Sequence, residues 1–284
     1  MPCSAITLSL ATICAVVSVA LLAIAFGTDN WQYIKVNRVE IEKQLVGSSI
    51  TPDNFLNVGL YYTRTKGLFR VCYPEELPNG ERLYLSPVET QCQNIDYHIF
   101  DEDSDVTSFS DDEMARLHMA RSMIALFIVS FFFVFVAFFT GVAGCWRRSP
   151  GNVASTAILM LLSCLFAAGG MGLWHGVEYY EEERIRTAPF RGSWDDLLVS
   201  GTISVYDWSY FLAWIGVGWA LISTLLFFGA SVCLRSEGEL EDKNMAYIMP
   251  VYPQKQQYPT YGYGYPPPAA YQYATSPQYG HYNY

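Results

Sequence analysis

The stretch from Gly67 to Cys92 reads GLFRVCYPEELPNGERLYLSPVETQC and places Cys72 and Cys92 20 residues apart. Aromatic and β-branched side chains mix with polar ones along it, and Pro78-Asn79-Gly80 interrupts it with a turn-forming sequence. This composition is typical of short strands joined by hairpin turns. Because 51% of the chain is apolar, the location of this stretch relative to a membrane depends on the rest of the sequence.

Four long apolar runs, almost free of charge, dominate the rest of the sequence. They are Ala5–Phe26, Met123–Val142, Val153–Trp174 and Trp208–Leu234. A helix of about 20 residues crosses a hydrocarbon core of about 30 Å. Buried helices of a soluble protein could imitate one such run, but four in succession favour a membrane protein. We therefore predict four transmembrane spans, at about residues 5–26, 121–145, 153–174 and 208–234.

The first run also has a feature of signal peptides, since Ala23-Ile24-Ala25 resembles a small-x-small cleavage site. No basic residue precedes the run, and it is long for a signal peptide, so a retained span is favoured and cleavage is the alternative. The later spans would keep their topology in either case.

Basic residues in the short loops predict the orientation. Arg147 and Arg148 lie between the second and third runs without an acid, and Arg235 follows the last run. Short cytoplasmic loops are enriched in Lys and Arg, so both chain ends are expected in the cytoplasm. The loops at residues 30–118 and 175–207 are then outside the cell.

The two outer loops are acidic. The first contains 15 acids and 8 bases, and the second 7 acids and 3 bases. A nucleic-acid partner is disfavoured, because phosphate binding needs the opposite sign. The acidic runs Glu181-Glu182-Glu183 and Asp101–Asp105 are read as solvated faces, with a cation-attracting patch as the alternative.

The predicted topology separates the outer cysteines from the rest. Cys72 and Cys92 are the only pair on the oxidising side, which predicts a disulfide between them. Closing a loop of this length contributes about 3 kcal/mol in the chain-entropy view. Metal ligation is the alternative, but the four histidines are scattered and no CxxC occurs, so we expect no metal site.

The other five cysteines fall into two groups. Cys14 and Cys164 lie within spans, where a thiol packs as a small hydrophobe. Cys3, Cys145 and Cys233 lie at the cytoplasmic face, where either palmitoylation or a reduced thiol is expected.

Ser110-Asp111-Asp112-Glu113 has the sequence of a helix start. A hydroxyl at the N-cap with Glu three residues later is a capping box, and acids suit the positive end of the helix dipole. We expect a helix to begin here and to run unbroken into the second span.

Together these features predict an α+β membrane protein. Residues 1–234 form a four-helix transmembrane bundle with a small extracellular antiparallel β-sheet that one disulfide staples. Strands are expected within Trp31–Val36, Leu60–Val71 and Arg82–Leu85.

Several of these residues carry a resemblance. Trp31 after the first span, Gly67-Leu68-Phe69, and then Cys72 and Cys92 resemble the signature of the claudin superfamily over about residues 5–234. That group includes claudins, peripheral myelin proteins and the γ subunits of calcium channels. Phe69 stands where the family signature has a second Trp.

Short matches look more like the γ-subunit branch. They are Gly27–Trp31, Cys92–Asp96 and Tyr206–Ser209.

Structural roles are the simplest interpretation of most of these residues. Trp31 is expected to anchor at the membrane interface, as aromatic belts do. Gly67 and Leu68 are expected to be structural. Small residues spaced four apart bring helices close, and here we expect them to pack the bundle internally. They are Ala11, Ala15, Gly216 and Ala220.

Residues 235–284 change composition to 11 tyrosines and 7 prolines. Such a segment cannot build a core, so a disordered cytoplasmic tail is expected. Its candidate contacts are an SH3 or WW groove for Pro266, Pro267 and Pro268, and a PDZ domain for Tyr282, Asn283 and Tyr284. A cytoplasmic scaffold or adaptor is therefore an expected partner.

We find no arrangement of catalytic residues and no cofactor motif, and we expect no enzyme. The resemblance implies a plasma-membrane protein at cell–cell junctions, acting in adhesion or as a paracellular barrier through its extracellular sheet. The partners would be lipid and membrane proteins in cis or trans, including other copies of this chain. The alternative is an auxiliary subunit that controls trafficking or gating of a channel or receptor.

Overall fold

The computed structural model describes residues 3–44, 58–74, 84–85, 90–97 and 110–248. The predicted turn at Pro78-Asn79-Gly80, the acidic run Asp101–Asp105 and the tail motifs at residues 266–268 and 282–284 lie outside these residues.

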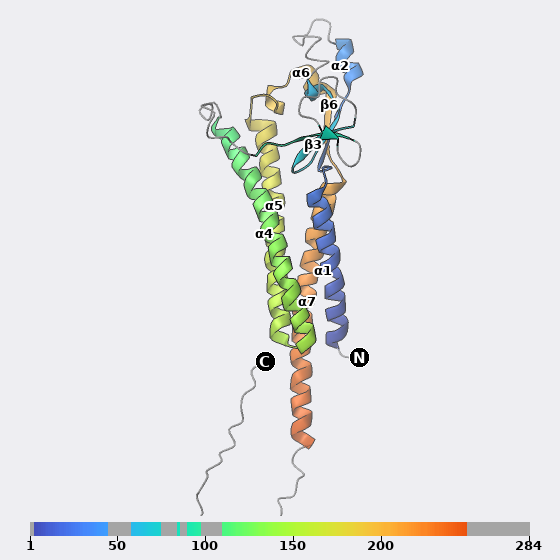
Figure 1. Ribbon diagram of the computed structural model, residues 1–284, viewed down its shortest axis with the longest axis vertical. Coiled ribbons are helices and arrows are strands. Elements are labelled where there is room, and N and C mark those ends of the chain that lie inside the picture. Colours follow the sequence, from blue (N-terminus) through green and yellow to red (C-terminus); the bar gives the residue numbers. More distant parts are fainter. Residues whose placement is uncertain (1–2, 45–57, 75–83, 86–89, 98–109, 249–284) are drawn as a thin grey trace, which may run out of the picture.

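Four long helices form the body of the molecule (Figure 1). They are α1 (Cys3–Gly27), α4 (Asp111–Arg147), α5 (Pro150–Tyr179) and α7 (Trp208–Ile248). A π-helical turn, η3 (Tyr180–Arg184), extends α5. All four are long and apolar enough to cross a membrane. The chain is therefore a four-span membrane protein, as the apolar runs predict.

The start of α4 follows the predicted capping box. Ser110 Oγ accepts a hydrogen bond from the Glu113 amide at 3.3 Å, and the Ser110 amide donates to Glu113 Oε2 at 2.8 Å. These bonds satisfy amides that a helix start leaves without intrahelical partners. The helix consequently begins ten residues before the expected span, and it projects beyond the apolar run at the end of the bundle that carries the sheet.

Small residues let α1 and α7 approach each other, as expected. Ala11 and Ala220 are buried, and a Cβ placed on Gly216 would lie 2.8 Å from Leu22 Cγ. Ser18 Oγ donates to the Gly216 carbonyl at 2.8 Å. These contacts are inside the bundle.

A six-stranded antiparallel sheet lies at one end of the bundle, above α1 and α7 (Figure 1). Its order is β4-β5-β3-β2-β1-β6. The strands are β1 (Gln32–Val36), β2 (Arg64–Lys66), β3 (Arg70–Tyr73), β4 (Tyr84–Leu85), β5 (Gln91–Asn94) and β6 (Thr202–Tyr206). Cys72 and Cys92 lie opposite each other on β3 and β5, and their disulfide is present.

Strand β6 comes from the second loop and was not predicted. It pairs with β1 along its whole length, from Gln32 opposite Tyr206 to Val36 opposite Thr202. Its sequence, TISVY, does alternate β-branched with polar residues, which is the signal that could have identified it. The two loops therefore form a single sheet.

Besides the β1–β6 pairing, short helices from the two loops pack against each other. They are α2 (Arg38–Gln44), η1 (Gly59–Tyr61), η4 (Arg191–Ser193) and α6 (Asp196–Gly201). Val36, Ile41, Tyr61 and Leu198 form a small apolar core between them.

Helix α7 continues to Ile248, so the expected boundary at residue 235 falls inside a helix. The expected disorder therefore does not hold for residues 235–248. This segment contains three Glu and one each of Arg, Leu, Lys, Met and Ala, which favour helix, and a helix that already exists extends without a new nucleation step. Residues 249–284 lie outside the described part of the chain.

Candidate functional site

The signature tryptophan lies in the junction between sheet and bundle. Trp31 is fully buried, and its indole Nε1 donates to the Ala25 carbonyl at 2.7 Å. Its ring centroid lies 5.0 Å from that of Trp174 and 6.1 Å from that of Phe127. The expected role as an anchor at the lipid interface is therefore not what the structure shows, because the side chain packs inside the protein.

Gly67, Leu68 and Phe69 form the underside of the sheet at the same junction. A Cβ on Gly67 would lie 2.5 Å from the Asp29 Cα, so only glycine fits there. Leu68 is fully buried. Phe69 meets Phe26 edge to face, with ring centroids 5.1 Å apart. An aromatic ring at position 69 therefore still packs onto the first span.

Polar residues at the ends of α1 and α7 tie the sheet to both helices. Arg70 Nη2 lies 2.6 Å from Asp29 Oδ2. Burial raises the pKa of Asp29, and the Arg70 guanidinium offsets part of that effect. Asn30 Nδ2 donates to Asp207 Oδ2 at 3.0 Å. The segments that resemble the γ-subunit branch, 27–31 and 206–209, therefore lie side by side.

A buried ionic cluster joins the sheet to the outer ends of α4 and α5. Glu181 of η3 pairs with Lys66 of β2 and with Arg116 of α4, whose Nη2 lies 2.6 Å from Glu181 Oε1. The three side chains, which we call the sheet–bundle triad, are only 12–15% exposed. Such a cluster is stable only when each charge keeps its partner.

Other acids of the second loop are paired too. Glu182 Oε1 lies 3.3 Å from Arg191 Nη1, and Glu178 Oε2 accepts from the Tyr206 hydroxyl at 2.6 Å. Of the run Glu181-Glu182-Glu183, only Glu183 is exposed. The interpretation of this run as a solvated face or a cation-attracting patch therefore fails for Glu181, whose charge Lys66 and Arg116 neutralise.

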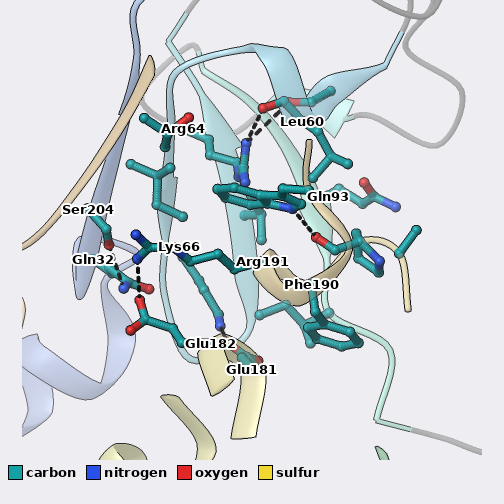
Figure 2. A pocket seen from close by; sticks show the side chains of 18 of the residues that line it. Gln32, Leu60, Arg64, Lys66, Gln93, Glu181, Glu182, Phe190, Arg191 and Ser204 are labelled. Carbon is teal, nitrogen blue, oxygen red and sulfur yellow. Dashed lines mark hydrogen bonds and ion pairs between the residues drawn. The ribbon is translucent and has the colours of Figure 1, made fainter. Parts of the chain in front are cut away.

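A cavity of about 760 Å³ opens between the inner face of the sheet, the turn at residues 188–194 and the ends of α4 and α5 (Figure 2). Both outer loops contribute to its wall. Its polar lining comes from the strands and from α4, α5, η3 and η4, while its apolar lining includes Ile34, Val58, Leu60, Val71, Ile95, Phe190 and Trp194. This volume is in the range of small-molecule sites.

Arg64 is the buried cation of this cavity. Its Nη1 donates to the carbonyls of Gly59, Leu60 and Tyr62 at 3.4, 2.9 and 3.3 Å. Its guanidinium carbon lies 5.5 Å from the centroid of the Trp194 ring. Burial lowers the pKa of Arg64, but a guanidinium remains charged at neutral pH. Nothing in the local sequence distinguishes this arginine from a solvated one.

The cysteines at the opposite end differ from one another. Cys145 is free and exposed, so it keeps the thiol that palmitoylation requires. Cys233 is disulfide-bonded and offers no free thiol for that modification. The side chain of Cys3 lies outside the described residues. Cys14 and Cys164 are free and buried, as expected for cysteines within spans.

Within the described residues, no group of three or more His, Cys, Asp or Glu side chains is placed to hold a metal ion.

The chain also matches a known protein family. The family described as PMP-22/EMP/MP20/Claudin tight junction matches residues 16–229. That range includes the sheet, the disulfide and most of the four apolar runs. No curated protein matches the chain in sequence.

Proposed function

Because the chain belongs to the PMP-22/EMP/MP20/Claudin family, we propose that it acts without catalysis at cell–cell contacts. Its sheet would face outward and bind membrane proteins of the same or the neighbouring cell, including other copies of this chain. The family description names the tight junction, which supports a role at cell contacts.

The orientation in this proposal rests on charge. Arg147 and Arg148 lie at the tight connection between α4 and α5, at the end of the bundle opposite the sheet. Positive residues in short loops favour the cytoplasmic side. The sheet would then be extracellular, with both chain ends in the cytoplasm.

The observation that carries the proposal is the free edge of the sheet at β6. Within the described residues, β6 pairs with β1 alone. Ile203 and Val205 point away from the cavity and are 63% and 49% exposed. An unpaired edge with exposed apolar side chains is a template for strand addition by another protein. The contacts at Trp31, Gly67 and Asp29 attach the sheet to the bundle.

The tail supplies the second part of the proposal. Residues 249–284 would reach a cytoplasmic scaffold through Pro266–Pro268 or the carboxyl-terminal Tyr282-Asn283-Tyr284. A scaffold bound there would hold the protein at the contact that the sheet makes.

Mixed cell layers test the role at contacts. Cells that express the tagged chain are grown with cells that lack it, and the signal is compared at borders between two expressing cells and at mixed borders. We expect enrichment only where two expressing cells meet. Val205→Lys should abolish it, because a charge cannot enter an apolar strand contact. Ser200→Lys, an exposed position on α6 two residues before β6 begins, adds the same charge outside the strand and should leave the enrichment intact.

A second function has one observation in its favour. The γ-like segments at residues 27–31 and 206–209 are hydrogen-bonded to each other, so they lie together in the fold. An even surface distribution in the mixed layers, together with co-purification of a channel or receptor, would replace the contact role with that of an auxiliary subunit.

A further inference from the structure

The cavity beneath the sheet contains one cation without an anionic partner among the residues that the structure describes. Lys66 and Arg116 pair with Glu181, and Arg191 pairs with Glu182. Arg64 has no ion pair within the described residues, although it is only 6% exposed. A buried charge without a counter-charge is costly, so the site around Arg64 favours the binding of an anion.

The geometry of the Arg64 guanidinium limits which anion fits. Its Nη1 is engaged by three backbone carbonyls, whereas Nε and Nη2 have no partner within the part of the chain that the structure describes. Nε and Nη2 form one edge of the guanidinium, and that edge matches the two oxygens of a carboxylate. A single negative charge would complement Arg64, because Lys66, Arg116 and Arg191 already have carboxylate partners.

A second polar group in the wall of the cavity has no hydrogen-bond partner among the described residues. It is the hydroxyl of Thr202, which is buried. Thr202 lies on β6 and lines the same cavity as Arg64 of β2. Buried hydroxyls in native structures almost always have a partner, which points to a molecule that the cavity accommodates.

The apolar residues of the cavity wall indicate that the bound molecule also has an apolar part. Ile34, Val71 and Phe190 supply apolar surface, and Trp194 presents a ring beside Arg64. A bare inorganic ion needs neither this surface nor a volume of about 760 Å³. We propose that the cavity binds a small organic anion with a carboxylate on an apolar body. The carboxylate sits on the free edge of Arg64, and the Thr202 hydroxyl adds a hydrogen bond.

The carboxylate has two accessible sources. Arg116 lines the cavity and lies five residues before the expected start of the second span, which is about 7 Å along a helix. The cavity is therefore close to the membrane surface and can be reached by a fatty acid from the outer leaflet or by a soluble aromatic acid. The proposal does not depend on the role at cell contacts.

The test uses the full chain in lipid nanodiscs, with empty nanodiscs subtracted. Equilibrium binding is measured for indole-3-acetate and for oleate, each against its neutral analogue, tryptophol and oleyl alcohol. We expect one saturable site for a carboxylate and at least tenfold weaker binding of its neutral analogue, as loss of a charged hydrogen bond predicts. Binding of oleate alone assigns the lipid source, and binding of indole-3-acetate assigns the soluble one.

Three variants connect the site to its residues. Arg64→Met should weaken carboxylate binding by at least tenfold, and Thr202→Val by about fivefold. Thr65→Val makes the same change as Thr202→Val on the opposite face of β2 and should leave binding unchanged. If Arg64→Met does not fold, Thr202→Val and the neutral analogues decide. The proposal is overturned if neither carboxylate binds, if the neutral analogues bind equally well, or if Thr202→Val matches Thr65→Val.

Discussion

Glu181→Gln should loosen the sheet from the bundle. Glu181 is the only acid of the sheet–bundle triad, and it pairs with Lys66 from the sheet and with Arg116 from α4. The substitution keeps the size of the side chain but removes its charge. Both cations would then be left in a site where they are 15% and 12% exposed.

The loss of stability expected for Glu181→Gln follows from the burial of the three charges. Removing one partner of a buried ion pair costs about 3–5 kcal/mol, because the remaining charge is neither paired nor solvated. The introduced glutamine side chain would still offer an amide oxygen as an acceptor, so we expect the lower end, about 3 kcal/mol. For a chain of this size, 1 kcal/mol lowers the unfolding midpoint by about 2–4 °C. The thermal midpoint should therefore fall by about 6–12 °C.

The assay has a reporter within the site. Lys66 Nζ lies 5.7 Å from the centroid of the Trp174 ring, so intrinsic tryptophan fluorescence in nanodiscs reports on this region. Hydrogen exchange should also become faster in β2, whereas the middle of α4 should keep its protection. Glu183→Gln is the matched control, since Glu183 is exposed and belongs to the same acidic run. Its effect should stay within about 0.5 kcal/mol.

A triple variant separates charge from packing. Combining Glu181→Leu with Lys66→Met and Arg116→Met removes all three charges, and apolar replacements of buried ion clusters are often neutral or stabilising. The triple variant should therefore recover most of the lost midpoint. Equal midpoints for Glu181→Gln and Glu183→Gln would refute the reasoning, because Glu181 would then not neutralise buried charge.

Three further predictions concern the junction and the disulfide. Gly67→Ala should destabilise the outer domain by several kcal/mol, because its Cβ would lie 2.5 Å from the Cα of Asp29, just after α1. Gly172→Ala is the control, because its Cβ would meet open space and the change should be tolerated. Surface expression is measured for both variants. Cys72→Ser should cost about 3 kcal/mol and reduce the amount of protein at the cell surface; normal surface levels under non-reducing conditions would contradict this. Trp31→Phe keeps an aromatic ring but loses the 2.7 Å bond from Nε1, so the thermal midpoint should fall by about 2–6 °C, and an unchanged midpoint would count against the role of that bond.

The spans, the α4 cap and the disulfide could be predicted because each has a local cause. An apolar run of about 20 residues has few stable solutions other than a membrane helix. The capping box at Ser110 needs only four consecutive residues. The disulfide needs only the topology, which leaves Cys72 and Cys92 as the sole outer pair.

The features that were missed depend on contacts between distant segments. Glu181 reads as one of three solvated acids until the fold brings Lys66 to it, 115 residues away in the sequence. Arg64 likewise becomes special only because η1 and Trp194 enclose it. Trp31 was expected at the lipid interface, and its burial follows from its packing against Trp174 and Phe127, which lie on other spans. Local patterns carry no record of such pairings.

The pairing of β1 with β6 makes the sheet and the helices dependent on each other. Strand β1 begins five residues after α1 ends, and β6 ends two residues before α7 begins. Any shift of α1 against α7 would therefore shear the ladder between these strands, and the hydrogen bond from Asn30 to Asp207 would break with it. A partner that adds a strand to the edge of β6 would act on the same ladder. Such a partner would consequently favour one arrangement of the two helices, so binding outside the cell is mechanically coupled to the membrane bundle.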